Sequence, residues 1–103
     1  MGNSYSSDQT TLNLAVIGTD TLSRAGRARI TSIQGKGIAS STLLLYDAAT
    51  AGAAAAGNLV ATYNYGTEGL EVYVPGSGIL FKNGIVYNLA GAGGSVTITI
   101  TGA

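Results

Sequence analysis

The chain has 103 residues, with five Lys and Arg against five Asp and Glu, sixteen Gly, one Pro, and neither Cys nor His. This length suits one domain rather than two. The absence of Cys and His excludes disulfides, Cys/His zinc sites, haem ligated by these residues, and nucleophiles that depend on a thiolate or an imidazole. We therefore expect a small domain that is not an enzyme and has no cofactor or metal.

The charge is low as well as balanced: only 10% of the residues are charged, and the formal net charge is zero. A soluble domain usually has about a quarter of its residues charged. Either Ser and Thr hydrate the outer strand faces, or partners cover much of the surface. No stretch approaches the roughly 20 apolar residues of a membrane span, and the start of the chain lacks the basic-then-apolar profile of a secretory signal. No membrane partner is expected.

The first third of the chain predicts a polar arm and two strands. Residues 1–11 are polar and predict an N-terminal arm, with a single β-sandwich domain over residues 12–103. Leu12, Leu14 and Val16 alternate and predict the first strand. The segment 27–34 also alternates, except that Ile33 falls on the wrong side. A β-bulge near Thr31 and Ser32 would correct the phase.

The middle of the chain predicts a central strand and a loop. Residues 42–46, Thr-Leu-Leu-Leu-Tyr, are apolar on both sides, which is typical of a central strand covered on both faces. The Ala-rich segment 48–57 is too short between its glycines to form a stable helix. We expect it to be a loop, with or without a single turn.

The remaining segments predict further short strands. Residues 59–65 place Leu59, Ala61, Tyr63 and Tyr65 on one side, and in 70–74 Leu70, Val72 and Val74 alternate with Glu71 and Tyr73. Residues 79–81 and 85–89 flank Lys82-Asn83-Gly84, which predicts a tight hairpin. Residues 96–101 alternate Val or Ile with Thr. The fold class expected is all-β: an antiparallel β-sandwich of seven or eight short strands, for which a jelly roll is one arrangement.

Basic residues form the first candidate partner interface. Arg24, Arg27, Arg29 and Lys36 lie within thirteen positions, and a strand edge carrying Arg27 and Arg29 would suit an acidic patch on a protein. The alternative is a solvated face whose arginines protect an edge strand from aggregation. Nucleic acid is not expected as a partner, because a neutral chain lacks long-range attraction to phosphates.

Tyrosines form the second candidate interface, in which we include Tyr5, Tyr63 and Tyr65. Tyr63 and Tyr65 share a strand face and could stack on a sugar, although core or subunit contact is the stronger expectation for tyrosines in half-buried strands. Of the carboxylates, only Glu68 and Glu71 are close in sequence. Their offset of three in an extended segment sends them to opposite faces, so a catalytic pair is not expected.

The segment 27–101 resembles a family of small virion proteins of tailed bacteriophages. The resemblance lies in the basic strand 27–30, the apolar strand 43–47 ending in Tyr-Asp, a small-residue loop, the run Val-Tyr-Val-Pro-Gly-x-Gly-Ile-x-Phe-x-x-Gly-Ile-x-Tyr over 72–87, and a final Val/Thr/Ile strand. It implies a capsid decoration or cement protein in the virion, made in the host cytoplasm, bound to the major capsid protein as a homo-oligomer, trimer or dimer. A neck, tail or capsid-fibre component, or a carbohydrate- or host-surface-binding module, is the alternative.

Overall fold

The computed structural model describes residues 9–36, 40–74, 76, 78–91 and 95–102. In these residues the chain forms nine strands and two single 3-10 turns, Ala51–Ala53 and Ala56–Asn58. The strands are β1 (Gln9–Leu14), β2 (Thr21–Ala25), β3 (Ala28–Lys36), β4 (Ser41–Asp47), β5 (Leu59–Tyr65), β6 (Leu70–Tyr73), β7 (Ile79–Phe81), β8 (Gly84–Gly91) and β9 (Ser95–Gly102).

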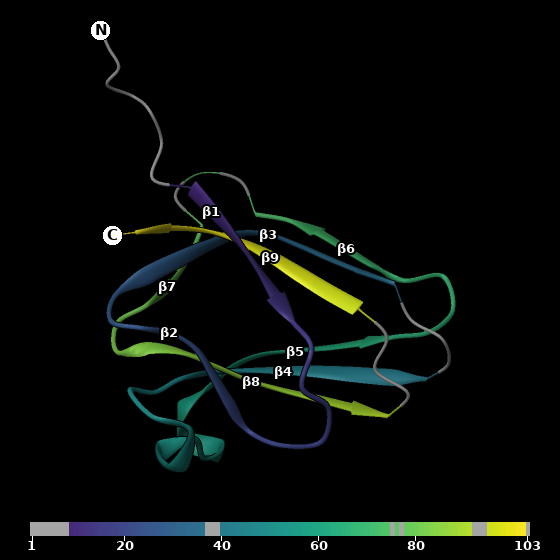
Figure 1. Cartoon of the computed structure of the whole chain (residues 1–103). Coiled ribbons are helices and arrows are strands. Elements are labelled where there is room, and N and C mark those ends of the chain that lie inside the picture. The colour runs from purple at the N-terminus through teal and green to yellow at the C-terminus, as the bar shows by residue number, and fades with distance from the viewer. Residues whose placement is uncertain (1–8, 37–39, 75, 77, 92–94, 103) are drawn as a thin grey trace, which may run out of the picture.

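The strands form two antiparallel sheets that stack as two layers (Figure 1). Sheet I has the order β1-β9-β3-β6, with β7 also paired to β3, and sheet II has the order β2-β8-β4-β5. β6 and β7 pair with successive parts of the same edge of β3, so together they act as one interrupted strand. Two four-stranded sheets with these connections make the sandwich a jelly roll.

The core lies between the sheets and consists of aliphatic side chains from alternate strand positions. Val96, Ile98 and Ile100 are at most 1% exposed, as their alternation predicts. They face buried residues of sheet II such as Leu43 and Leu45. Full burial of such a side chain stabilises the fold by about 1.5–3 kcal/mol, so the two apolar inner faces hold the layers together.

The predicted bulge in β3 is confirmed. The pairing of β3 with β9 shifts register between Ile30 and Ser32, and Thr31 donates a side-chain hydrogen bond to the carbonyl of Thr99 at 3.2 Å. Because the extra residue restores the phase, Ile30 and Ile33 are both fully buried. The loop prediction for 48–57 is also confirmed, with two single turns instead of one.

Two predictions about strands are wrong in detail. The sequence shows no alternation over Thr21–Ala25, yet this segment is β2, because a register shift between Leu22 and Arg24 breaks the period of two. β1 begins at Gln9, within the predicted arm, because Thr10 and Thr11 pair with β9. The rest of the arm, residues 1–8, lies outside the described residues.

The predicted hairpin at Lys82-Asn83-Gly84 is wrong, because β7 pairs in sheet I and β8 pairs in sheet II. The chain changes sheets at this point. The carboxylate of Asp47, at the end of β4, accepts hydrogen bonds from the backbone N–H groups of Lys82 at 3.0 Å and Asn83 at 2.8 Å. Asp47 thus binds a turn that lies far away in the sequence.

Candidate functional site

The structure separates the predicted basic interface into two ends of β3. Arg27 lies in the β2–β3 turn and is exposed, and Arg29 lies on the outer side of β3, while Lys36 lies at the far end of the same strand. Seven residues of strand between Arg29 and Lys36 amount to about 23 Å. β3 is not an edge strand, since it pairs with β9 on one side and with β6 and β7 on the other. The prediction of a basic strand edge is therefore wrong.

The backbone at the β2–β3 end brings Arg24, Arg27 and Lys82 into one region, called the basic cluster below, which also holds the carboxylate of Asp47. Lys82 is a residue that the sequence did not single out. The N–H of Gly26 donates to the carbonyl of Asn83 at 3.1 Å, which brings the turn carrying Arg27 beside exposed Lys82. Arg24 lies nearby on β2, where its Nε donates to the carbonyl of Ala25 at 3.3 Å. Lys82 is distant in sequence from the arginines, so only the sheet-to-sheet connection could have identified it.

The tyrosines divide between the core and the surface. Tyr65 is 7% exposed and belongs to the core, and Tyr63 packs against the same core. Burial raises the pKa of Tyr65 above its ordinary value of 10.0, and a hydrogen bond with the Ser41 side chain partly offsets that rise. These rings cannot provide the sugar-stacking face considered from the sequence, whereas the stronger expectation, core contact, agrees with their position. Tyr5 lies outside the described residues.

The two outer faces of the sandwich differ in chemistry. On sheet II, an apolar row crosses all four strands: Leu22 pairs with Val86, Val86 with Tyr46, and Tyr46 with Leu59. Leu22 and Leu59, at the ends of the row, are 38% and 41% exposed, whereas Val86 within it is fully buried. The sequence predicted Leu59 on the same side as Tyr63, but a register shift in β4–β5 pairs it with Tyr46 instead. Tyr46 itself was expected to be covered, and it is half-buried.

Sheet I presents hydroxyl and amide side chains on its outer face. One row across its strands is Asn13, Thr97, Gln34 and Glu71, and the next is Thr11, Thr99, Ser32 and Tyr73. Thr97 donates its hydroxyl hydrogen bond to the Asn13 side chain at 3.0 Å. Tyr73 is 80% exposed. The sequence already placed Tyr73 out of phase with Leu70 and Val72, which was the signal that could have identified it.

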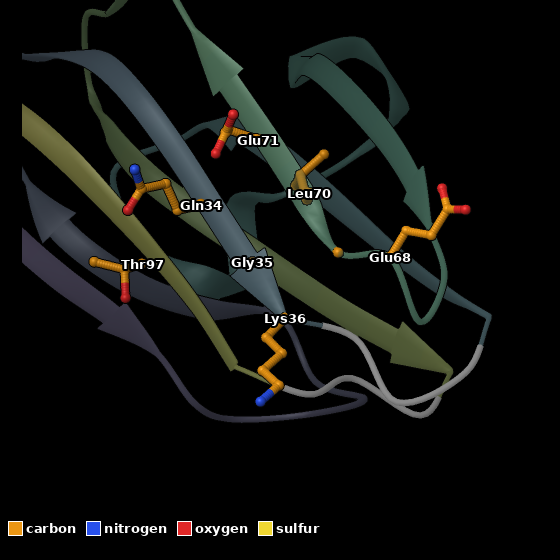
Figure 2. Close-up of a pocket in the computed structure, with 8 residues that line it drawn as sticks. Gln34, Gly35, Lys36, Glu68, Leu70, Glu71 and Thr97 are labelled. Carbon is orange, nitrogen blue, oxygen red and sulfur yellow. The ribbon is translucent and has the colours of Figure 1, made fainter.

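A hollow of about 560 Å³ opens where β3 ends and β6 begins, and its lining includes Gln34, Lys36, Glu68 and Glu71. Figure 2 shows that the side chains of Lys36, Glu68 and Glu71 extend in different directions and do not converge on one point. Glu68 lies in a turn that the hydrogen bond from the Gly69 N–H to the Gly66 carbonyl closes at 2.9 Å. The arrangement offers no shared ligand position for the two carboxylates.

Across the described ranges, no group of three or more Asp or Glu side chains could hold a metal ion. No helix in the described part of the chain is long and apolar enough to cross a membrane.

Comparison with models of protein families, with curated proteins and with solved structures finds no match to this chain.

Proposed function

We propose that this chain is a non-enzymatic structural protein of a tailed-phage virion, and that it decorates the capsid by docking the outer face of sheet II on the major capsid protein. The sequence resemblance supports the setting. Jelly rolls are also common among viral capsid domains, although fold alone does not define function. The neck, tail or capsid fibre is the alternative position in the virion.

The observation that carries the proposal is the apolar row on sheet II. Leu22, Leu59 and neighbouring Val60 are 38–41% exposed, whereas Val86 between them is fully buried. Half-buried Tyr46 pairs with both Val86 and Leu59, so the accessible apolar surface lies at Leu22, Tyr46, Leu59 and Val60. The rest of the outer face of sheet II has polar groups such as Thr42 and Asn64, which are hydrogen-bonded to each other, and the outer face of sheet I has mainly hydroxyl and amide groups. An uncharged apolar face suits an uncharged protein surface, because binding then removes apolar area from water without desolvating a charge.

The size of this face indicates how docking would work. Sheet II is about 19 Å across its four strands and about 23 Å along a seven-residue strand. This gives roughly 440 Å², about half of what one partner contributes to a standard protein interface. A single copy would therefore bind weakly. Repetition on a lattice, or assembly into the proposed dimer or trimer, would supply the missing affinity through avidity.

Copy number in the particle tests the position in the virion. Quantitative mass spectrometry of virions purified from the encoding phage should find this chain in numbers comparable with those of the major capsid protein. A few copies per particle would overturn capsid decoration and favour the neck, tail or fibre. Absence of the chain from virions would overturn the structural role altogether.

A binding experiment tests the docking face. Leu59→Ser should weaken co-sedimentation of the purified protein with capsids that lack it by about tenfold or more, because a buried Leu contributes about 1.5–3 kcal/mol. Thr97→Ser, on the outer face of sheet I, is the matched control and should bind as the wild type does. Equal loss in both variants, or no loss in Leu59→Ser, would show that sheet II is not the docking face.

A further inference from the structure

Tyr73 is the most exposed of the large hydrophobic side chains in the described part of the chain. It ends β6, an edge strand of sheet I, and its ring lies outside because Leu70 and Val72 occupy the inward positions and pack against the core. An exposed Tyr offers a large rigid contact surface with a polar tip, at little conformational entropy cost. The stability of the fold does not explain why this aromatic ring is exposed to solvent.

Beside Tyr73 lies a hollow of about 460 Å³, within the usual size range of small-molecule sites. Its lining includes the hydroxyl residues Thr31, Ser32 and Thr99 and the amide residue Gln34. Among the described residues, no charged side chain lines this hollow. The surface therefore combines one aromatic ring with several uncharged groups that both donate and accept hydrogen bonds.

The walls of the hollow are held in place by the bulge in β3. Thr31 donates from its hydroxyl to the carbonyl of Thr99 at 3.2 Å, and its own carbonyl accepts from the N–H of Val74 at 2.9 Å. Ser32 lies between Tyr73 and Thr99 in the pairing register, so Tyr73 and Thr99 are about 10 Å apart across two strand spacings. These bonds fix the Thr31 side chain and the backbone that carries Ser32 and Thr99 before any ligand arrives, which lowers the entropy cost of binding.

We propose that this hollow binds a neutral oligosaccharide, with one sugar ring stacked on Tyr73 and its hydroxyls bonded by Ser32, Gln34 and Thr99. A pyranose ring has an apolar C–H face and a rim of hydroxyls that each donate and accept. The ring of Tyr73 matches that face, and hydroxyl and amide side chains match that rim. The missing charge in the lining favours a neutral sugar over a phosphorylated or sulfated one, because anions bind best to charged donors.

Single-stranded nucleic acid fits this surface less well. Such sites combine stacking aromatics with a positively charged groove, whereas Arg29 and Lys36 lie outside the lining of this hollow. The proposal does not depend on the virion function, and the two are compatible because the sugar site and the apolar row lie on opposite outer faces of the sandwich. Loss of one property would leave the other measurable.

The test is titration of the ¹⁵N-labelled protein with cello-, malto- and manno-oligosaccharides, followed by NMR. We expect saturable shifts at the amides of Ser32, Tyr73 and Thr99 with a dissociation constant of about 0.1–10 mM, as befits a small open site. Tyr73→Ala should weaken binding by about tenfold or more, while Tyr73→Phe, which keeps the ring, should stay within about threefold of the wild type.

Leu59→Ala, an exposed apolar truncation on the opposite face, is the matched control and should bind as the wild type does. Because Tyr73 is exposed, its variants should keep the wild-type spectrum outside the hollow, and this confirms that they fold. Failure of all three neutral series to shift these amides would overturn the proposal. Unchanged binding by Tyr73→Ala would overturn it as well, as would tighter, salt-sensitive binding of sulfated sugars or oligonucleotides, which would indicate an anion site.

Discussion

Asp47 connects the end of β4 with the segment by which the chain passes from sheet I to sheet II. Its two carboxylate oxygens accept hydrogen bonds from the N–H groups of Lys82 and Asn83, at 3.0 and 2.8 Å. Asp47→Ala removes both acceptors from a connection that joins strands of different sheets. We expect this variant to fold but to have a lower free energy of unfolding than the wild type.

The magnitude follows from the exposure of the two hydrogen bonds. A net hydrogen bond contributes about 0.5–1.5 kcal/mol, and more when a charged acceptor is buried. Both bonds of Asp47 are exposed, so water can solvate the released amides. Each bond should therefore contribute about 0.5–1.5 kcal/mol and not the larger amount of a buried charged acceptor. The loss should be about 1–3 kcal/mol, which lowers the melting temperature of a domain of this length by roughly 5–20 °C. Asp47→Asn keeps one acceptor oxygen and should lose about half as much.

Urea unfolding of these two variants beside the wild type and Glu71→Ala, an exposed carboxylate on β6, measures the effect. Amide hydrogen exchange should also become faster at Lys82 and Asn83 in Asp47→Ala, because their acceptors are gone. The reasoning fails if Asp47→Ala unfolds at the same urea concentration as Glu71→Ala. It also fails if exchange at the two amides does not change.

Three further predictions concern a close backbone approach, a buried phenol and the basic cluster. A Cβ on Gly84 would lie 2.6 Å from the carbonyl oxygen of Ala48, whereas one on Gly26 would meet nothing within 4 Å. In thermal unfolding, Gly84→Ala should therefore lower the free energy of unfolding by about 3 kcal/mol or more, and Gly26→Ala by only about 1 kcal/mol. Equal losses in the two variants would contradict the steric argument. Because burial raises the pKa of Tyr65 above 10.0, the contribution of the neutral phenol to stability is fully present below about pH 10 and is lost as the pH rises through the folded pKa. In urea titrations Tyr65→Phe should therefore lose less stability than the wild type as the pH rises above about 10, and parallel curves would refute this. If the basic cluster contacts an acidic partner, Arg27→Ala should weaken capsid binding and reduce its salt dependence, and an unchanged salt slope would exclude that contact.

Much of the fold could be predicted from alternation, because one face of each sheet is buried and the period of two is then strict. Val96, Ile98 and Ile100 reveal their inward face directly. The misplaced Ile33 located the bulge at Thr31, since a one-residue slip moves every later side chain to the other face. In β2 a bulge had the opposite effect: it removed the alternation from a five-residue segment, and no other signal remained.

The sheet membership of strands could not be predicted from local residues. Asn83-Gly84 has the composition of a two-residue hairpin turn. In the structure this segment connects the two sheets instead, and the carboxylate of Asp47, 35 residues before Lys82, accepts a hydrogen bond from the Lys82 N–H. Similarly, Tyr63 and Tyr73 both lie in strands with alternating side chains, so alternation alone does not show which ring faces the core. The size of the other side chains on the inner face of each strand decides it. Leu70 and Val72 fill the inner positions of β6, whereas in β5 the small Ala61 leaves the inner space to tyrosine rings.

The two explanations for the low charge apply to different sheets. On sheet I the outer rows built around Thr97 and Thr99 supply hydroxyls at each strand spacing, so hydration of that face needs few charges. On sheet II the row from Leu22 to Leu59 has no charge and only the phenol of Tyr46 as a polar group, and a partner would have to cover its exposed ends, Leu22 and Leu59, to keep their apolar area from water. Low charge is therefore compatible with a molecule that turns one face to a protein surface and the other to solvent, and the exposed ring of Tyr73 lies on the solvent side.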